Sequence, residues 1–118
     1  MTDTKELLQL AALAAGIEID EFLPLNGGAW AYTKDSDVNS DGEHCIFKWQ
    51  PHTNSGDSRD LQVKLKISLE WVEDFDGDRW DASIWNGDSW LHRAHTDPNM
   101  AVLIVASELG KAMIKEIK

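Results

Sequence analysis

The residues whose spacing most resembles a set of metal ligands lie in a polar segment of the N-terminal half. Asp37, Asn39 and Asp41 carry side-chain oxygens at alternate positions and Gly42 follows, as in the first half of a calcium-binding loop. The second half does not match, because Lys48 stands where such a loop needs a bidentate glutamate. A polar hairpin tip over residues 35–42 accounts for this composition, so we predict no calcium site there.

The four histidines and the single cysteine could together supply zinc ligands. The sequence contains neither a C-x-x-C pair nor an H-E-x-x-H motif, so we predict no metal site. A small metal-binding protein or metal-dependent enzyme that uses the aspartate and histidine residues is the alternative hypothesis. The candidate ligands are His44, His52, His92, His95 and Cys45.

Nucleophilic catalysis has no recognisable centre in this sequence. There is no G-x-S-x-G motif and no glycine-rich loop that could cradle a phosphate. Cys45 is followed by Ile46 and Phe47, which is typical of a small hydrophobe in a strand rather than of an activated thiolate. We therefore predict a protein that is not an enzyme, with no catalytic residue and no cofactor.

Tryptophan is the informative residue type, with six copies against three phenylalanines and one tyrosine. Strand alternation over the second half of the chain sorts four of them onto two faces. One face is apolar and is predicted to lie in the core, with Trp71, Trp80, Ile84 and Leu91. The other places tryptophans among polar residues, as partner-binding surfaces do. Its candidate binding residues are Asp81, Trp85, Trp90 and His92.

The Asn86-Gly87 pair predicts a two-residue hairpin turn. In that register Trp85 pairs with Asp88, and Ser83 pairs with Trp90, so the two indoles are diagonal neighbours on one partly exposed face. Two interpretations stay open. The indoles either anchor a partner protein or only stabilise the hairpin.

Helices are predicted at both ends of the chain. Asp3 with Glu6 forms a capping-box pattern, helical apolar spacing follows, and Gly16 ends a helix over residues 3–15. Asp97-Pro98 places a capping residue and a first-turn proline at the start of the final helix. Residues 17–28 are predicted to be a connector, and residues 29–33 and 45–49 a hairpin.

The segment after residue 56 has two interpretations. Apolar residues alternate from Leu61 to Trp71, which predicts one long strand. Asp57 or Ser58 could instead cap a helix over residues 57–65 that leads into a strand over 67–73.

Residues 49–65, WQPHTNSGDSRDLQVKL, resemble a segment found in short, uncharacterised phage and prophage proteins of Gram-negative bacteria, to which NinX-type proteins are distantly similar. Those proteins share the pattern W-N-P-x-x-D-x-G-D-A-L-x-L-x-V-K-L, a similar first helix and a last helix opened by Asp-Pro. This chain departs from the pattern at Gln50, at Asn54 and at Ser58-Arg59. The resemblance favours the helix followed by a strand, and implies a phage accessory role without a known activity.

Composition sets the broad class. The length of 118 residues predicts one domain over residues 1–118. No run of apolar residues is long enough to span a membrane. The single cysteine and the lack of a signal-peptide pattern predict the bacterial cytoplasm. The predicted fold class is α+β, an antiparallel sheet of four to five strands with the N- and C-terminal helices packed on one face.

The net charge of −10 opposes binding to nucleic acid and to anionic membranes, and favours a partner with a basic surface. It would also serve solubility alone. The leading functional hypothesis is a non-enzymatic phage or prophage accessory protein that binds a host protein. A more specific form of this hypothesis is an inhibitor of a host defence or nucleic-acid-handling protein. The hypothesis is compatible with a monomer or a homodimer.

Overall fold

The computed structural model describes residues 4–33, 46–73, 75 and 77–117, and these form an α+β fold. The α-helices are α1 (Thr4–Ala15), α2 (Ser55–Leu65) and α3 (Pro98–Ile117), and a short 3-10 helix, η1, covers Pro24–Asn26. The strands are β1 (Ile17–Phe22), β2 (Ala29–Thr33), β3 (Phe47–Trp49), β4 (Ser68–Val72), β5 (Arg79–Trp85) and β6 (Trp90–His95).

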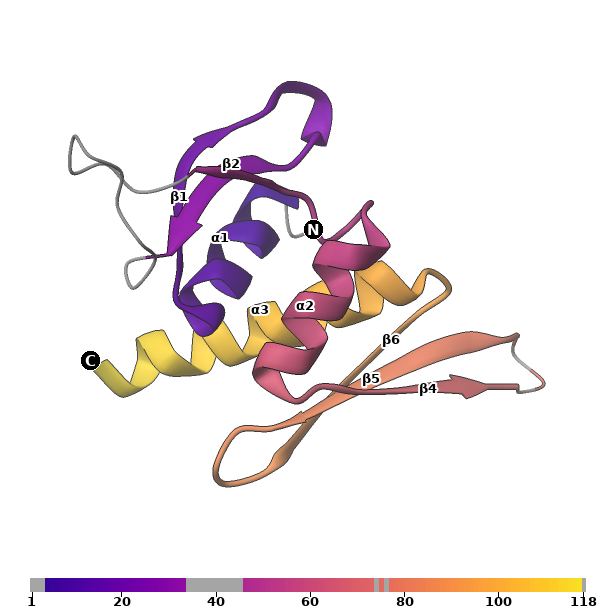
Figure 1. Cartoon of the computed structure of the whole chain (residues 1–118). Helices are drawn as coiled ribbons and strands as arrows, with labels where there is room; N and C mark the ends of the chain where they lie inside the picture. The colour runs from indigo at the N-terminus through magenta and orange to yellow at the C-terminus, as the bar shows by residue number, and fades with distance from the viewer. Residues whose placement is uncertain (1–3, 34–45, 74, 76, 118) are drawn as a thin grey trace.

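The strands form two antiparallel three-stranded sheets, in the orders β1-β2-β3 and β4-β5-β6, with the helices between them (Figure 1). The prediction of one sheet of four to five strands is therefore wrong. Residues 17–22 belong to the predicted connector, but in the structure they form strand β1. Gly16 ends α1 with a φ of 72°, and the residues after it pair with β2. This added strand completes a second sheet around the predicted hairpin of β2 and β3.

The terminal helices also divide between the two sheets. Helix α3 packs on β5 and β6, whereas α1 packs on β1 and along α3. The prediction that both helices lie on one face of one sheet is wrong in this respect. The two sheets are joined because their helices pack on each other.

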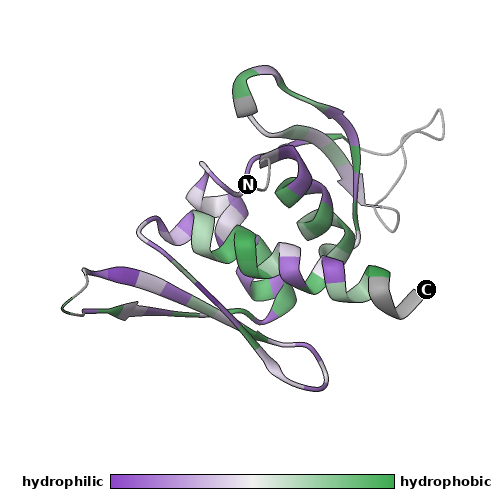
Figure 2. Cartoon of the chain, turned by 180° about the vertical axis from the view of Figure 1, so that it is seen from behind, coloured by the Kyte–Doolittle hydropathy of each residue, from purple (hydrophilic) through white to green (hydrophobic). Residues whose placement is uncertain are grey.

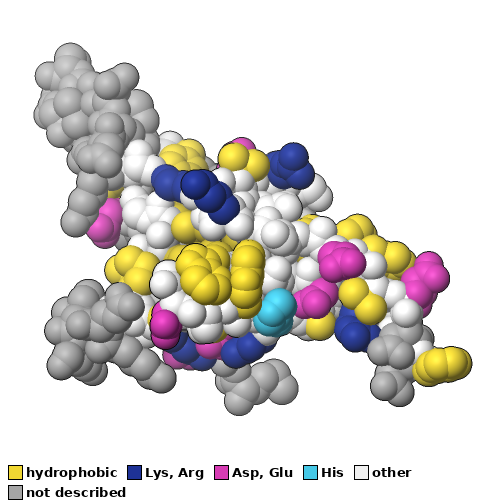
Figure 3. All heavy atoms as spheres, turned by 90° about the horizontal axis from the view of Figure 1, so that it is seen from below, with side chains coloured by type: hydrophobic (Ala, Val, Ile, Leu, Met, Phe, Trp, Pro, Cys, Tyr) yellow, Lys and Arg dark blue, Asp and Glu magenta, His cyan; other side chains and the backbone are white. Residues whose placement is uncertain are grey.

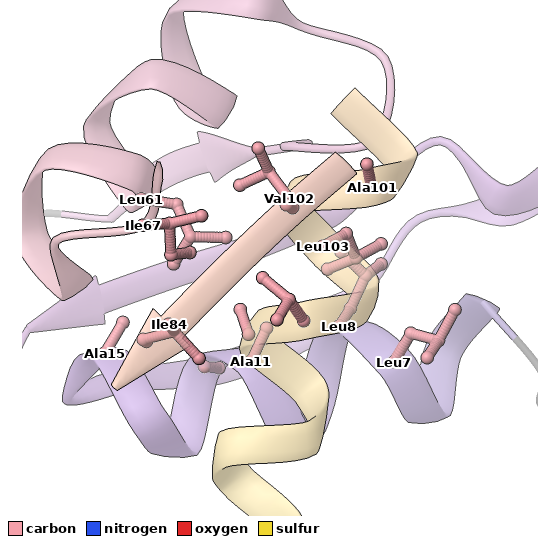
Figure 4. Packing of buried hydrophobic residues seen from close by; sticks show 14 of the residues in the cluster. Leu7, Leu8, Ala11, Ala15, Leu61, Ile67, Ile84, Ala101, Val102 and Leu103 are labelled. Atoms are coloured by element: carbon pink, nitrogen blue, oxygen red, sulfur yellow. The ribbon is translucent and has the colours of Figure 1, made fainter. Parts of the chain in front are cut away.

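One hydrophobic cluster runs through this helix layer. Figure 4 shows Leu8 and Ala11 of α1 beside Leu103 of α3, with Ile84 of β5 nearby, and Figure 2 shows apolar segments on the helices where they meet. The helices approach so closely that a Cβ at Gly110 would lie 2.1 Å from the carbonyl oxygen of Leu10. The contact explains a glycine in the interior of a helix, where it otherwise costs about 1 kcal/mol relative to alanine.

The segment after residue 54 is a helix followed by a strand, as the resemblance favoured. The cap differs from the predicted Asp57 or Ser58. It is Asn54, whose Oδ1 accepts the Asp57 N–H at 2.9 Å. Asp57 Oδ2 in turn accepts the Gln50 N–H at 2.9 Å and ties the preceding loop to the helix. Lys66, at a φ of 57°, ends α2 in the left-handed region.

The start of α3 follows the prediction. Asp97 caps the helix, since its Oδ1 accepts the Asn99 N–H at 2.9 Å and its carbonyl accepts the Ala101 N–H at 3.0 Å. The Asp97 N–H donates to His95 Nδ1 at 2.9 Å, which fixes the corner between β6 and α3. None of the helices in the described part of the chain has the length and apolar character needed to cross a bilayer.

Candidate functional site

The β4-β5-β6 sheet has one face against α3 and one face turned away from the helix layer. Directly paired residues share a face, so the register assigns each side chain. The inner face contributes Ala82 and Ile84, both buried, to the core. We call the opposite side the outer face. It is made of Ser68, Glu70, Val72, Arg79, Asp81, Ser83, Trp85, Trp90, His92 and Ala94.

Trp85 and Trp90 form the aromatic part of the outer face. They are directly paired, with ring centroids 5.5 Å apart and an interplanar angle of 64°, an edge-to-face arrangement. Their exposed fractions are 51% and 53%. The prediction that both indoles lie on the face away from the core and are partly exposed is thus confirmed.

The predicted register of this hairpin is wrong. Four residues, 86–89, connect β5 to β6 instead of two, so the indoles are direct partners and not diagonal neighbours. The Asn86 side chain organises the longer turn, because its Oδ1 accepts the N–H groups of Asp88 and Ser89, each at 2.8 Å. Such side-chain acceptance is typical of asparagine in turns, and Gly87 supplies the positive φ of 98°.

The inner face carries a second tryptophan pair. Trp71 and Trp80 lie 5.1 Å apart at 61°, and Trp80 packs partly buried against the core cluster. Trp71 is 44% exposed, so its predicted core position is wrong. Its indole reaches the sheet edge, where Nε1 donates to Glu73 Oε1 at 3.4 Å.

Two carboxylates face each other across the outer face. Glu70 of β4 is directly paired with Asp81 of β5, and the small Ala94 completes the row. Among the residues that the structure describes, neither carboxylate has an ion-pair partner. Like charges directly opposite each other destabilise a sheet, so this row is an unfavourable feature of the isolated fold.

The four predicted binding residues do share one face. The row of Ser83 and His92 lies between the tryptophan pair and the row that holds Asp81. Figure 3, seen from the side of this sheet, shows hydrophobic side chains beside a histidine with charged side chains around them. Sequence reasoning missed Glu70, because only the β4–β5 register reveals that it stands opposite Asp81.

The candidate metal ligands do not gather in the part of the chain that is described. No three His, Cys, Asp or Glu side chains there lie close enough together to hold an ion. His52 is buried near α2, while His92 and His95 lie on opposite faces of the sheet. The half-matching calcium segment, residues 35–42, lies outside the described residues, as do His44 and Cys45.

Comparison with known proteins finds no protein family, no curated protein and no solved structure that matches this chain.

Proposed function

We propose that this chain is a non-enzymatic accessory protein of a phage or prophage that acts in the host cytoplasm by binding a host protein with a basic surface. The outer face of the β4-β5-β6 sheet is the binding surface. The observation that carries the proposal is the half-exposed Trp85–Trp90 pair on the same sheet face as the opposed carboxylates of Glu70 and Asp81.

The tryptophan pair has the properties of an interface anchor. Tryptophan is among the residues most enriched at binding hot spots, and an edge-to-face pair is a rigid, amphipathic contact surface. About half of each indole still meets solvent, so a partner has apolar area left to cover. The direct cross-strand pairing holds both rings in place before binding.

The opposed carboxylates supply the charge preference. A partner lysine or arginine placed between Glu70 and Asp81 would relieve their repulsion and gain two ion pairs at once. The net charge of −10 adds a long-range attraction for basic surfaces, which raises the rate of association. A basic nucleic-acid-binding groove fits both features, and its occupation would inhibit a host nucleic-acid-handling or defence protein.

The test is affinity purification from a bacterial host, comparing the wild-type chain with the double variant Trp85→Ala/Trp90→Ala. Trp30→Ala is the matched control, because Trp30 is also exposed but belongs to β2 in the other sheet. We expect one partner to copurify with the wild type and with the control and to be lost with the double variant. Retention of that partner by the double variant would refute the outer face as the binding surface.

A further inference from the structure

A groove on another side of the molecule shares no residue with the outer face. Its volume is about 630 Å³, within the range of ~300–1,000 Å³ that is common for ligand sites. Among the described residues, its lining comes from one side of α1, the beginning of β1 and Ile114 near the end of α3. Its lining includes Glu6, Leu10, Leu13, Ile17, Ile19 and Ile114.

The groove borders the edge of β1 that has no partner strand among the described residues. Ile17, Glu18 and Ile19 are consecutive, so their side chains alternate between the two faces of the strand, yet all three line the groove. That is expected where a groove borders the edge of a strand rather than one of its faces. Strand β1 is the outer strand of its sheet and, among the described residues, pairs with β2 alone.

The walls of the groove are apolar and incompletely covered. Leu13 of α1 is 40% exposed and Ile114 of α3 is 37% exposed, although both helices bury other apolar side chains in the core. Leu10, one turn before Leu13, is almost fully buried and closes the bottom of this wall. Apolar side chains packed against Leu13 and Ile114 would remove this remaining area from water.

The charged residues that line the groove in the described part of the chain, Glu6 and Glu18, are both acidic. They belong to a chain with a net charge of −10. A segment that combines apolar side chains with lysine or arginine therefore complements the groove, whereas an acidic segment is repelled.

We propose that this groove binds an extended apolar and basic segment of a partner protein, which adds to the edge of β1 as a further strand. Backbone hydrogen bonds to β1 would supply affinity, and alternate side chains would select the sequence. Apolar side chains on one side of the segment pack against Leu13 and Ile114. A basic side chain lies near Glu6.

Two short synthetic peptides test the proposal directly, one of sequence Lys-Val-Thr-Val-Lys and one of sequence Glu-Val-Thr-Val-Glu. Each is titrated into the full chain while amide hydrogen exchange is followed. We expect the lysine peptide to bind at least about tenfold more tightly than the glutamate peptide and to slow exchange at β1 amides. Equal affinities, no binding of either peptide, or protection confined to the β4-β5-β6 sheet would each overturn it.

Two substitutions locate the bound peptide. Leu13→Ser and Glu6→Lys should each weaken the lysine peptide by about tenfold or more. Their controls are Val63→Ser, at an exposed position of α2, and Asp78→Lys, in the β4–β5 turn, and both should leave the affinity unchanged. Circular dichroism confirms that each variant is folded. A dimer of the wild type that Leu13→Ser dissociates would show that a second copy fills the groove, and would overturn the proposed partner.

Discussion

The two tryptophan pairs of the β4-β5-β6 sheet have nearly the same geometry but opposite surroundings. Both are direct cross-strand pairs, with centroids 5.1 Å apart for Trp71–Trp80 and 5.5 Å apart for Trp85–Trp90, and interplanar angles of 61° and 64°. Trp80 packs against the core cluster below α3, whereas neither indole of the outer pair belongs to that cluster.

Comparing the two pairs distinguishes the contribution of a tryptophan pair to the stability of the fold from the exposed indole surface that can bind a partner. A cross-strand aromatic pair contributes about 0.2–1 kcal/mol relative to a pair of alanines. Burial against the core adds to this only for Trp80. The outer pair therefore stabilises the fold less than the inner pair does. About half of the surface of each outer indole stays exposed and can contact a partner.

The largest expected effect is at the inner pair. Trp80→Ala removes an indole that packs on the core cluster, and we expect it to lower the free energy of unfolding by about 3 kcal/mol. Urea denaturation measures the change. A loss below about 1 kcal/mol would mean that the inner pair is as peripheral to stability as the outer pair.

A smaller effect is expected at Asn86, in the turn that aligns Trp85 with Trp90. Asn86→Ala deletes the oxygen that accepts the N–H groups of Asp88 and Ser89, and should lower the free energy of unfolding by about 1–2 kcal/mol. The control is Asp88→Ala, at an exposed position of the same turn, which should change it by less than about 0.5 kcal/mol. Equal effects in urea denaturation would show that the Asn86 side chain does not organise the turn.

At the outer pair itself we expect little change in stability. Trp85→Ala removes one cross-strand aromatic contact and should lower the free energy of unfolding by at most about 1 kcal/mol. The measurement is the same denaturation experiment as for Trp80→Ala. Equal losses for the two variants would favour the interpretation that the outer pair only stabilises the hairpin.

The smallest effect has the opposite sign. Glu70→Gln removes one of two like charges that face each other across β4 and β5, and should raise the free energy of unfolding by about 0.5 kcal/mol. Glu21→Gln is a suitable control, since the residue directly opposite Glu21 is Trp30 rather than an acid. If Glu70→Gln destabilises the protein, the carboxylate has a structural role and its proposed function in binding loses its support.

Local chemistry in the sequence predicted much of the fold. Asp97-Pro98 opens α3, and strand alternation placed Trp85, Asp81 and His92 on the face away from the core. These features depend on residues close together in the chain. The sequence indicated a turn at Asn86-Gly87 but not its length. The turn is longer than two residues because the Asn86 side chain accepts the N–H groups of Asp88 and Ser89.

The errors in the number of sheets and in the placement of the terminal helices came from contacts between distant segments. Strand β1 is short and carries Glu18, Asp20 and Glu21, so its composition was not that of a strand, and only pairing with β2 makes it one. Gly110 lowered the helix propensity of α3 without revealing that Leu10 of α1 touches its backbone. The opposition of Glu70 and Asp81, and the groove beside β1, likewise follow from tertiary register.

The most direct test of the outer face is the affinity of the purified partner for the wild type, Trp85→Ala and Trp30→Ala, measured by calorimetric titration. We predict that Trp85→Ala weakens binding by about 2 kcal/mol or more, roughly thirtyfold, while Trp30→Ala leaves it within about twofold. Equal affinities of the wild type and Trp85→Ala, or an equal loss in both variants, would contradict the assignment of the outer face as the binding surface.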